Sequence, residues 1–212
     1  MRIDSLRLEG FRNYGLAEAD FSPEVNVIIG DNAQGKTNML EAIYLLATGR
    51  SFRARSDRDL IGFDRENALI SAEGFASDRE RNVEMVFRRL GRRSTVSNGV
   101  KLKTAAQLGE GFSVVLFSPE DLGLIREGAA ARRRLMDACI SQLRPRYAGL
   151  LNVFNRAYEQ KTRILRDSED NPGLLELLDE YDIELARLSA ELIHYRAKFI
   201  ARLAPEAAKI HA

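Results

Sequence analysis

Apolar residues follow two different periods along the 212-residue chain. Up to about residue 117 they alternate with polar residues or form short β-branched runs, whereas beyond Gly128 they recur every three to four residues. The first pattern is typical of strands and the second of helices. The sequence therefore predicts an α/β region that is followed by a helical one.

In the first region, alternation predicts strands over residues 2–9 and 16–21. An antiparallel meander is predicted over residues 67–103, in which Asn98-Gly99 is the strongest short hairpin signal of the chain. Residues 25–29 and 114–117 are compact, largely β-branched or aromatic runs, which are typical of strands that are buried on both faces. We therefore expect both half-exposed and fully buried strands.

In the second region, the apolar spacing predicts helices over residues 129–143, 145–166 and 174–203. The segment SEDNPG at 168–173 is a loop that turns the chain back. These elements predict an antiparallel helical hairpin or bundle, in which the regularly spaced leucines serve core packing.

Residues 30–37 match G-x-x-x-x-G-K-[ST] through Gly30, Gly35, Lys36 and Thr37. In this motif backbone N–H groups cradle the α- and β-phosphates, the lysine reaches the β- and γ-oxygens, and the hydroxyl ligates Mg²⁺. Apolar residues recur at helical spacing after Lys36, so the phosphates would lie at a helix N-terminus. A tight turn rich in small residues is the simpler alternative, but it explains neither the lysine nor the flanking elements.

The turn Phe11-Arg12-Asn13-Tyr14 between the first two strands allows two interpretations. Arg12 and Asn13 could contact a nucleotide from outside the phosphate loop. Alternatively, the turn is a hydrophobic corner with a surface arginine, which its residue types slightly favour.

Two interpretations also remain for Ser118-Pro119-Glu120-Asp121, where a predicted buried strand ends in acidic residues. The carboxylates could hold Mg²⁺ and its attacking water. The pattern Ser-Pro-Glu-Asp is, however, also that of a capped helix start with carboxylates in the first turn, and this explanation fits better.

The composition of 45% hydrophobic and 30% charged residues is that of a soluble globular protein, and the net charge of +1 gives no general attraction to nucleic acid. A single cysteine, Cys139, excludes an internal disulfide and suits a reducing cytosol. Charged residues interrupt the N-terminus, and no stretch approaches ~18 consecutive apolar residues. We therefore expect a cytoplasmic protein with neither a signal peptide nor a membrane segment.

Arginines occur in runs, and arginine is the side chain best suited to bidentate phosphate contacts. The runs supply the candidate DNA-binding residues Arg50, Arg53, Arg55, Arg92, Arg93, Arg132, Arg133 and Arg134. For each run taken alone, a solvated protein surface is an equally good explanation.

Two elements of a complete ATPase are missing from the sequence pattern. Leu188-Ser189-Ala190-Glu191 lacks the glycine that a signature loop needs in order to present N–H groups to a γ-phosphate. The sequence also lacks a convincing acidic strand that would hold the metal. Either the chain is another class of phosphate-loop protein, or it is the first part of a longer one.

Five blocks of sequence resemble the RecF family, which is related to the SMC and ABC-type ATPases. The blocks keep their order and are LxLEGFRNY (6–14), IIGDNAQGKTNMLEAIYLLATGRSFR (28–53), LFSPEDLGLIREG (116–128), ARRRLMD (131–137) and LDEYDIELA (178–186). The resemblance implies an incomplete ABC/SMC-like P-loop ATPase head, with a mixed sheet and an antiparallel meander, over residues 1–115. It implies a helical arm subdomain over residues 116–212.

The resemblance also implies a function. Members of the family bind ATP and DNA, dimerise around two nucleotides, hydrolyse ATP slowly, and act with RecO and RecR to load RecA at single-strand gaps. On this chain Thr37 would ligate Mg²⁺. The implied ATP site comprises Gly30, Asp31, Asn32, Ala33, Gln34, Gly35, Lys36, Thr37 and Asn38.

The resemblance thus implies an ATP-dependent DNA-binding recombination mediator that recognises gapped, junction or duplex DNA and forms an ATP-dependent homodimer. A phosphotransferase with a helical lid and an SMC-like tethering ATPase are the alternatives. Because the acidic metal strand is missing, we expect the 212-residue chain by itself to bind ATP weakly and to show no detectable hydrolysis.

Overall fold

The computed structural model describes residues 1–103, 107–108 and 111–211, except for the side chains of Glu120 and Ile125. The chain divides into two compact units, residues 1–117 and residues 118–212. The first unit contains the sheet and one α-helix, and the second contains the three other α-helices.

The first unit is built on a six-stranded antiparallel sheet with the order β2-β1-β3-β4-β5-β6. Helix α1 spans Lys36–Thr48, and a short 3₁₀ helix, η1, spans Asp57–Leu60. The strands are β1 (Arg2–Phe11), β2 (Tyr14–Asp20), β3 (Asn67–Ala76), β4 (Arg79–Arg88), β5 (Ser94–Ser97) and β6 (Val100–Lys101). The expected strands at the N-terminus and the expected meander are confirmed.

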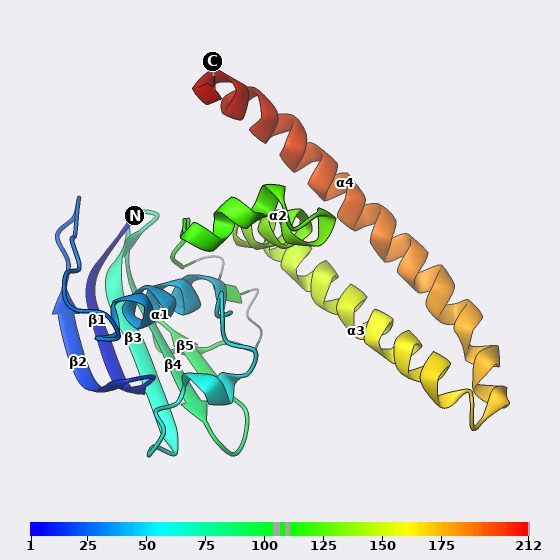
Figure 1. Cartoon of the computed structure of the whole chain (residues 1–212), viewed down its shortest axis with the longest axis horizontal. Helices are drawn as coiled ribbons and strands as arrows, with labels where there is room; N and C mark the ends of the chain where they lie inside the picture. Colours follow the sequence, from blue (N-terminus) through cyan, green and yellow to red (C-terminus); the bar gives the residue numbers. More distant parts are fainter. Residues whose placement is uncertain (104–106, 109–110, 212) are drawn as a thin grey trace. The chain divides into compact units, whose positions relative to one another are not determined.

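One face of the sheet is buried, as the alternation in the sequence predicts. Leu8 pairs with Ile70 and Ile70 with Met85, so the three central strands place a row of buried side chains across this face. Leu45 and Leu46 of α1 belong to the same core, and Figure 1 shows α1 lying along the sheet. The helix that begins at the predicted phosphate loop is therefore anchored on the sheet by apolar burial.

The Asn98-Gly99 prediction is confirmed. Both residues have positive φ, 47° for Asn98 and 77° for Gly99, and they connect β5 to β6. Positive φ at both central residues is what the tight hairpin turn requires, and asparagine and glycine tolerate it best.

The two predicted buried strands do not form. Residues 25–29 and 114–117 are assigned to no strand, and Val25, Ile29 and Val115 are respectively 78%, 85% and 95% exposed. A strand of this kind needs neighbours on both edges and cover on both faces. No described strand is paired with either segment, which explains why neither apolar run forms a strand.

The second unit consists of α2 (Ala129–Leu143), α3 (Pro145–Asp167) and α4 (Leu178–His211), with the 3₁₀ helices η3 (Pro119–Ile125) and η4 (Pro172–Leu177). Helices α3 and α4 form the expected hairpin, which Figure 1 shows in yellow and orange. The start of the last helix differs from the prediction, because Pro172–Leu177 forms a separate 3₁₀ turn before α4 begins.

The helix start at Ser118-Pro119 supports the capping interpretation. The Asp121 carboxylate accepts hydrogen bonds from the Ser118 backbone N–H (2.7 Å) and from the Ser118 hydroxyl (3.0 Å). Asp121 thus stabilises the first turn of η3. Among the described residues, no helix is both long enough and apolar enough to cross a membrane.

Candidate functional site: the phosphate loop and the arginine cleft

The phosphate loop runs from Gly30 to Gly35 and leads directly into α1, which begins at Lys36. Positive φ values occur at Gly30 (150°), Ala33 (64°) and Gly35 (107°). Residues with positive φ within a tight turn are a feature of anion-binding nests, in which successive backbone N–H groups face a bound anion. The first N–H groups of α1 add the partial positive charge of a helix N-terminus.

Gly35 is covered by the turn that follows β1. A Cβ atom at this position would lie 2.8 Å from Asn13 Oδ1 and 2.9 Å from a ring carbon of Tyr14. Asn13 also donates a hydrogen bond from Nδ2 to the carbonyl oxygen of Gln34 (3.1 Å). The β1–β2 turn therefore packs on the phosphate loop and fixes its end, so that both φ and space require glycine here.

Lys36 lies over the loop. Its Nζ donates to the carbonyl oxygens of Gly30 (2.7 Å) and Asp31 (2.8 Å). The ammonium group is thus held above the nest, where it adds positive charge, while the adjacent Thr37 is exposed. This arrangement suits the β- and γ-phosphates of a nucleoside triphosphate, with the Thr37 hydroxyl free to face solvent and a metal ion.

Glu41, on α1, is a fully buried carboxylate. Arg12 binds it through both Nε (2.9 Å to Oε2) and Nη2 (2.8 Å to Oε1), and Arg53 binds Oε2 through Nη2 (2.9 Å). Burial alone would raise the pKa of Glu41, but the hydrogen bonds from Arg12, Arg53 and Ser51 outweigh it and hold the pKa below its ordinary value. Glu41 is therefore ionised and shared by two guanidinium groups.

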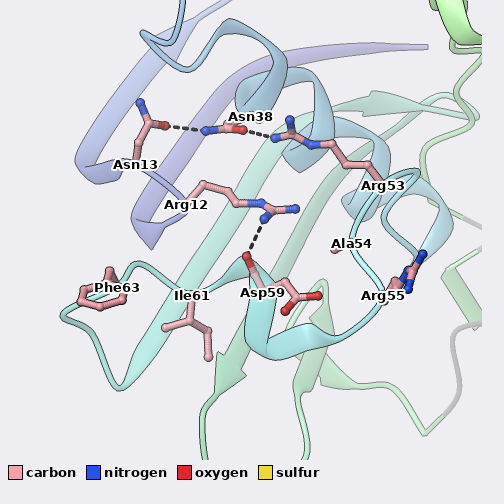
Figure 2. Close-up of a pocket in the computed structure, with 9 residues that line it drawn as sticks. All are labelled: Arg12, Asn13, Asn38, Arg53, Ala54, Arg55, Asp59, Ile61 and Phe63. Atoms are coloured by element: carbon pink, nitrogen blue, oxygen red, sulfur yellow. Dashed lines mark hydrogen bonds between the residues drawn. The ribbon is translucent and has the colours of Figure 1, made fainter.

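An open cleft of about 950 Å³ lies beside this cluster. Figure 2 shows Arg12, Arg53 and Arg55 around it, with Phe63, a 94% exposed residue, on the loop after η1. The complete lining is Arg12, Asn13, Asn38, Arg53, Ala54, Arg55, Asp59, Ile61 and Phe63. Because Asn13 also contacts the phosphate loop, the cleft and the loop share a border.

The predicted nucleotide contacts from outside the loop are placed as follows. Asn13 touches the loop, whereas Arg12 points to Glu41 and donates from Nη1 to the Asp59 carbonyl oxygen (2.6 Å). Arg12 is thus neither an isolated surface residue nor a member of the phosphate nest, but part of the cleft. Its direct contact with a nucleotide stays a prediction.

The arginine runs are split by the fold. Arg53 and Arg55 line the cleft, whereas Arg93 donates to the Gly49 carbonyl oxygen (2.7 Å) and pairs with Asp57 at 3.7 Å. The remaining candidates lie on the surface of their own units: Arg50 and Arg92 in the first, and Arg132, Arg133 and Arg134 on α2 in the second. Of these, Arg134 pairs with Glu127 at 3.5 Å.

Sequence reasoning missed Glu41 and Phe63. Glu41 precedes Leu45 by one helical turn, so a charged residue stands on the face of α1 that meets the core. A charge at a core position signals a buried partner, and this signal was available in the sequence. Nothing comparable marks Phe63, because its place on the cleft depends on how the loop after η1 folds.

Metal-binding chemistry is limited in the described part of the chain. No group of three or more histidine, cysteine, aspartate or glutamate side chains could hold a metal ion there. Binding of a magnesium ion by the Thr37 hydroxyl stays a prediction.

Comparison with known proteins agrees with this geometry. Residues 2–113 match the family described as the RecF/RecN/SMC N terminal domain. The chain belongs to the RecF/RecN/SMC family. This match covers the whole sheet, the phosphate loop and the cleft.

Relatives in the RecF/RecN/SMC family include proteins described as DNA replication and repair protein RecF. The chain is 36% identical to that of Agathobacter rectalis over 203 residues, which are 96% of this chain and 56% of the relative. It is 37% identical to that of Lacticaseibacillus casei over 211 residues, 99% of this chain and 57% of the relative. The expected likeness to the N-terminal portion of RecF is confirmed, and the chain spans little more than half the length of these relatives.

Solved structures give the same result. A structure described as the recombination mediator protein RecF-ATPrS in the RecFOR pathway matches with a TM-score of 0.88 and 33% identity, over 95% of this chain and 55% of that one. A structure described in terms of ATP-driven dimerization and DNA-stimulated activation of SMC ATPases matches with a TM-score of 0.50 and 23% identity, over 67% of this chain and 99% of that one. The fold is that of an ABC/SMC-type ATPase head with a helical arm.

Proposed function

We propose that the chain is the nucleotide-binding part of a RecF-type recombination mediator, and that it binds ATP at the phosphate loop. One observation carries the proposal: Asn13 and Tyr14 press on Gly35 and hold the nest at the N-terminus of α1, with the Lys36 ammonium above it. A preformed nest of N–H groups with a fixed lysine is complementary to a triphosphate and has little use in a purely structural turn.

In this proposal residues 30–38 hold the phosphates, and the Thr37 hydroxyl holds the Mg²⁺ ion that comes with the nucleotide. The space around Gly30 is open, because in the described part of the chain no atom beyond its immediate chain neighbours lies within 4 Å of the point that a Cβ atom would occupy there, and this leaves room for the phosphates to approach the backbone. The metal ion would neutralise phosphate charge, while Lys36 would exchange its loop carbonyl partners for phosphate oxygens.

For the whole protein we propose ATP-dependent binding to gapped or junction DNA, with an ATP-dependent homodimer that works with RecO and RecR to promote RecA loading. The relatives described as RecF support this role. Exposed arginines such as Arg132 and Arg133 on α2 would contact phosphates rather than bases, because phosphate contacts give affinity without reading sequence.

Nucleotide binding is tested by titrating the chain with a fluorescent ATP analogue in the presence of Mg²⁺. We expect saturable binding that Lys36→Ala weakens by about 10²-fold, because a charge-assisted contact to two phosphates is lost. The matched control is Lys101→Ala, which removes an exposed lysine from β6 and should leave affinity unchanged. Equal binding by the wild type and Lys36→Ala would refute the proposed site.

DNA binding by the whole protein is tested with gapped and fully duplex DNA at several salt concentrations, with and without the ATP analogue. We expect affinity to fall steeply with salt, and Arg132→Ala combined with Arg133→Ala to reduce the slope of log affinity against log salt by about 2. A salt-independent affinity would contradict the proposal. Transfer of phosphate from ATP to a sugar or nucleoside would favour the phosphotransferase alternative instead.

A further inference from the structure

Glu41 joins two turns that are far apart in the sequence. Its carboxylate accepts from Arg12 in the β1–β2 turn and from Arg53 and the Ser51 hydroxyl in the turn after α1. The Ser51 oxygen in turn accepts from the backbone N–H groups of Arg53 (3.0 Å) and Ala54 (2.7 Å). One buried carboxylate therefore fixes both the side chain of Arg53 and the backbone on either side of it.

The charges in this cluster do not balance. One carboxylate faces two guanidinium groups, so the cluster carries a net positive charge next to the open cleft. The Glu41 side chain is fully buried, whereas Arg12 is 21% and Arg53 is 40% exposed. Without the carboxylate, the two guanidinium groups would repel each other, and Arg53, the more exposed of the two, would be the one to move into solvent.

Arg53 begins a row of hydrogen bonds that ends in the phosphate loop. Arg53 donates to Asn38 Oδ1, Asn38 Nδ2 donates to Asn13 Oδ1 (2.6 Å), and Asn13 Nδ2 donates to the Gln34 carbonyl oxygen (3.1 Å). We call Asn13, Asn38 and Arg53 the amide row, and Figure 2 shows its three side chains in line. Each amide has its second group engaged, so the orientation of one fixes the orientation of the next.

We infer that Glu41 is a positioning residue for nucleotide binding. It holds Arg53, and through the amide row it fixes the Gly35 end of the phosphate loop. The inference rests on the proposed binding of ATP at that loop. In the described part of the chain, the hydrogen bonds of the Glu41 carboxylate go to Arg12, Arg53 and Ser51, so it acts on the loop through other residues.

The first test measures the affinity of adenosine 5′-(β,γ-imido)triphosphate with Mg²⁺ for the wild type and for Glu41→Gln, which keeps the volume and removes the charge. We expect about tenfold weaker binding, the effect of losing one charge-assisted hydrogen bond. The control is Glu18→Gln, which removes an exposed carboxylate that pairs with a single arginine at 3.1 Å. This control should bind the analogue as the wild type does.

The second test separates positioning from general stability. Asn38→Ala breaks the amide row at its centre without removing a buried charge, and it should also weaken binding about tenfold. In the double variant the losses of affinity should not add, because either change alone already releases the loop. The losses of thermal stability should add, because the buried charge and the amide act on stability separately.

A spectroscopic readout follows the amide row directly. In protein with ¹⁵N-labelled asparagine, the side-chain amide signals of Asn13 and Asn38 should lie apart from those of exposed asparagines. Glu41→Gln should move both signals towards the exposed position, although among the described residues the Glu41 carboxylate is hydrogen-bonded to Arg12, Arg53 and Ser51 and not to either asparagine. Unmoved signals, or additive losses of affinity, would overturn the inference. Failure of the wild type to bind the analogue would instead refute the proposed function.

Discussion

Each unit of the chain holds a carboxylate against arginine, fully buried at Glu41 and 18% exposed at Asp137, and the two clusters differ in where their hydrogen bonds lead. In the second unit Asp137 of α2 binds Arg196 of α4 through two nitrogens, both at 2.9 Å, and Tyr147 of α3 donates to the same carboxylate. This cluster joins one side chain from each of the three helices. In the first unit the Glu41 cluster continues through Asn38 and Asn13 to the phosphate loop.

The difference indicates that a carboxylate bound by arginine serves two purposes in this chain. The Asp137 cluster has matched charges and lies beside Ile140, Leu151 and Leu192, so it fixes how three helices pack. The Glu41 cluster has an excess positive charge and borders an open cleft, so a ligand in the cleft can contact its arginine side chains. Buried ion pairs contribute little net stability, but breaking one is costly, and both clusters can therefore specify a geometry.

Asp137→Ala should have the largest effect on stability. It leaves the Arg196 guanidinium, 19% exposed, without its carboxylate, and we expect a loss of about 3 kcal/mol in the free energy of unfolding. The measurement is urea unfolding followed by circular dichroism. Glu191→Ala is the control on α4, because its surface pairs with Arg187 and Arg146 should contribute under about 1 kcal/mol.

The same variant also tests whether the Asp137 cluster is independent of nucleotide binding. Under conditions in which Asp137→Ala is folded, its affinity for nucleotide should equal that of the wild type, because among the described residues the Asp137 carboxylate is hydrogen-bonded to Arg196 and Tyr147. A stability loss below about 1 kcal/mol would mean that water already screens the cluster. A loss of nucleotide affinity would mean that the two clusters are coupled.

Gly35→Ala should have the next largest effect, because it disrupts the loop end of the Glu41 network. The substitution requires alanine at a φ of 107° and places its Cβ 2.8 Å from Asn13. We expect a loss of about 2–3 kcal/mol in stability and no measurable nucleotide binding. Both are measured on the same sample by thermal unfolding and nucleotide titration.

Gly91→Ala is a close control for this substitution. Gly91 has nearly the same φ, 112°, but no atom lies within 4 Å of the added Cβ. The difference between the two variants therefore isolates the contact of the loop with Asn13 and Tyr14. Equal losses of stability and of nucleotide binding in the two variants would show that the contact of Gly35 with Asn13 and Tyr14 contributes to neither.

The sequence was sufficient where local rules decide the structure. The bounds of α2 and the start of α3 follow from apolar spacing and Pro145, and the last hairpin follows from Asn98-Gly99. The phosphate loop carries its own signature of glycine, lysine and threonine. At these places propensity, turn chemistry and spacing agree.

The sequence was insufficient where contacts between residues that are distant in the chain decide the structure. Residues 25–29 and 114–117 have the composition of buried strands, but a strand forms only when another strand pairs with it, and none of the described strands does. The amide row could not be predicted either, because it joins Asn13, Asn38 and Arg53 from three separate segments. Such contacts depend on the tertiary fold rather than on local spacing.

Tyr147→Phe should have a smaller effect than either substitution above. It removes a buried hydroxyl but leaves Asp137 bound to Arg196, so we expect a loss of about 1 kcal/mol at neutral pH. Burial, together with the neighbouring Asp137 carboxylate, raises the pKa of Tyr147. The stability that this tyrosine contributes is therefore present below its unfolded-state pKa of about 10 and is lost as the pH rises beyond it.

Unfolding measured between neutral and strongly alkaline pH checks this expectation. The free energies of unfolding of the wild type and Tyr147→Phe should converge above about pH 10. Tyr158→Phe, a change at an exposed tyrosine of the same helix, is the control and should follow the wild type throughout. A constant difference across the alkaline range would contradict the assignment.

The first unit should respond at the opposite end of the pH scale. The pKa of Glu41 lies below its ordinary value because the contacts from Arg12, Arg53 and Ser51 outweigh burial. Its contribution to stability is present above the unfolded-state pKa of about 4.3 and is lost as the pH falls through the lower folded-state pKa. Protonation removes the charge that holds two guanidinium groups together, so in acid the wild type should come to resemble Glu41→Gln.

Acid titration of the unfolding free energy distinguishes this behaviour from that of surface carboxylates. The difference between the wild type and Glu41→Gln should be constant near neutrality and shrink below about pH 4. Glu18→Gln should show no such convergence, because Glu18 is 64% exposed and pairs with one arginine only. If the difference between the wild type and Glu41→Gln persisted into strong acid, packing of the side chain rather than its charge would hold Arg12 and Arg53, and the contrast between the two clusters would have to rest on connectivity alone.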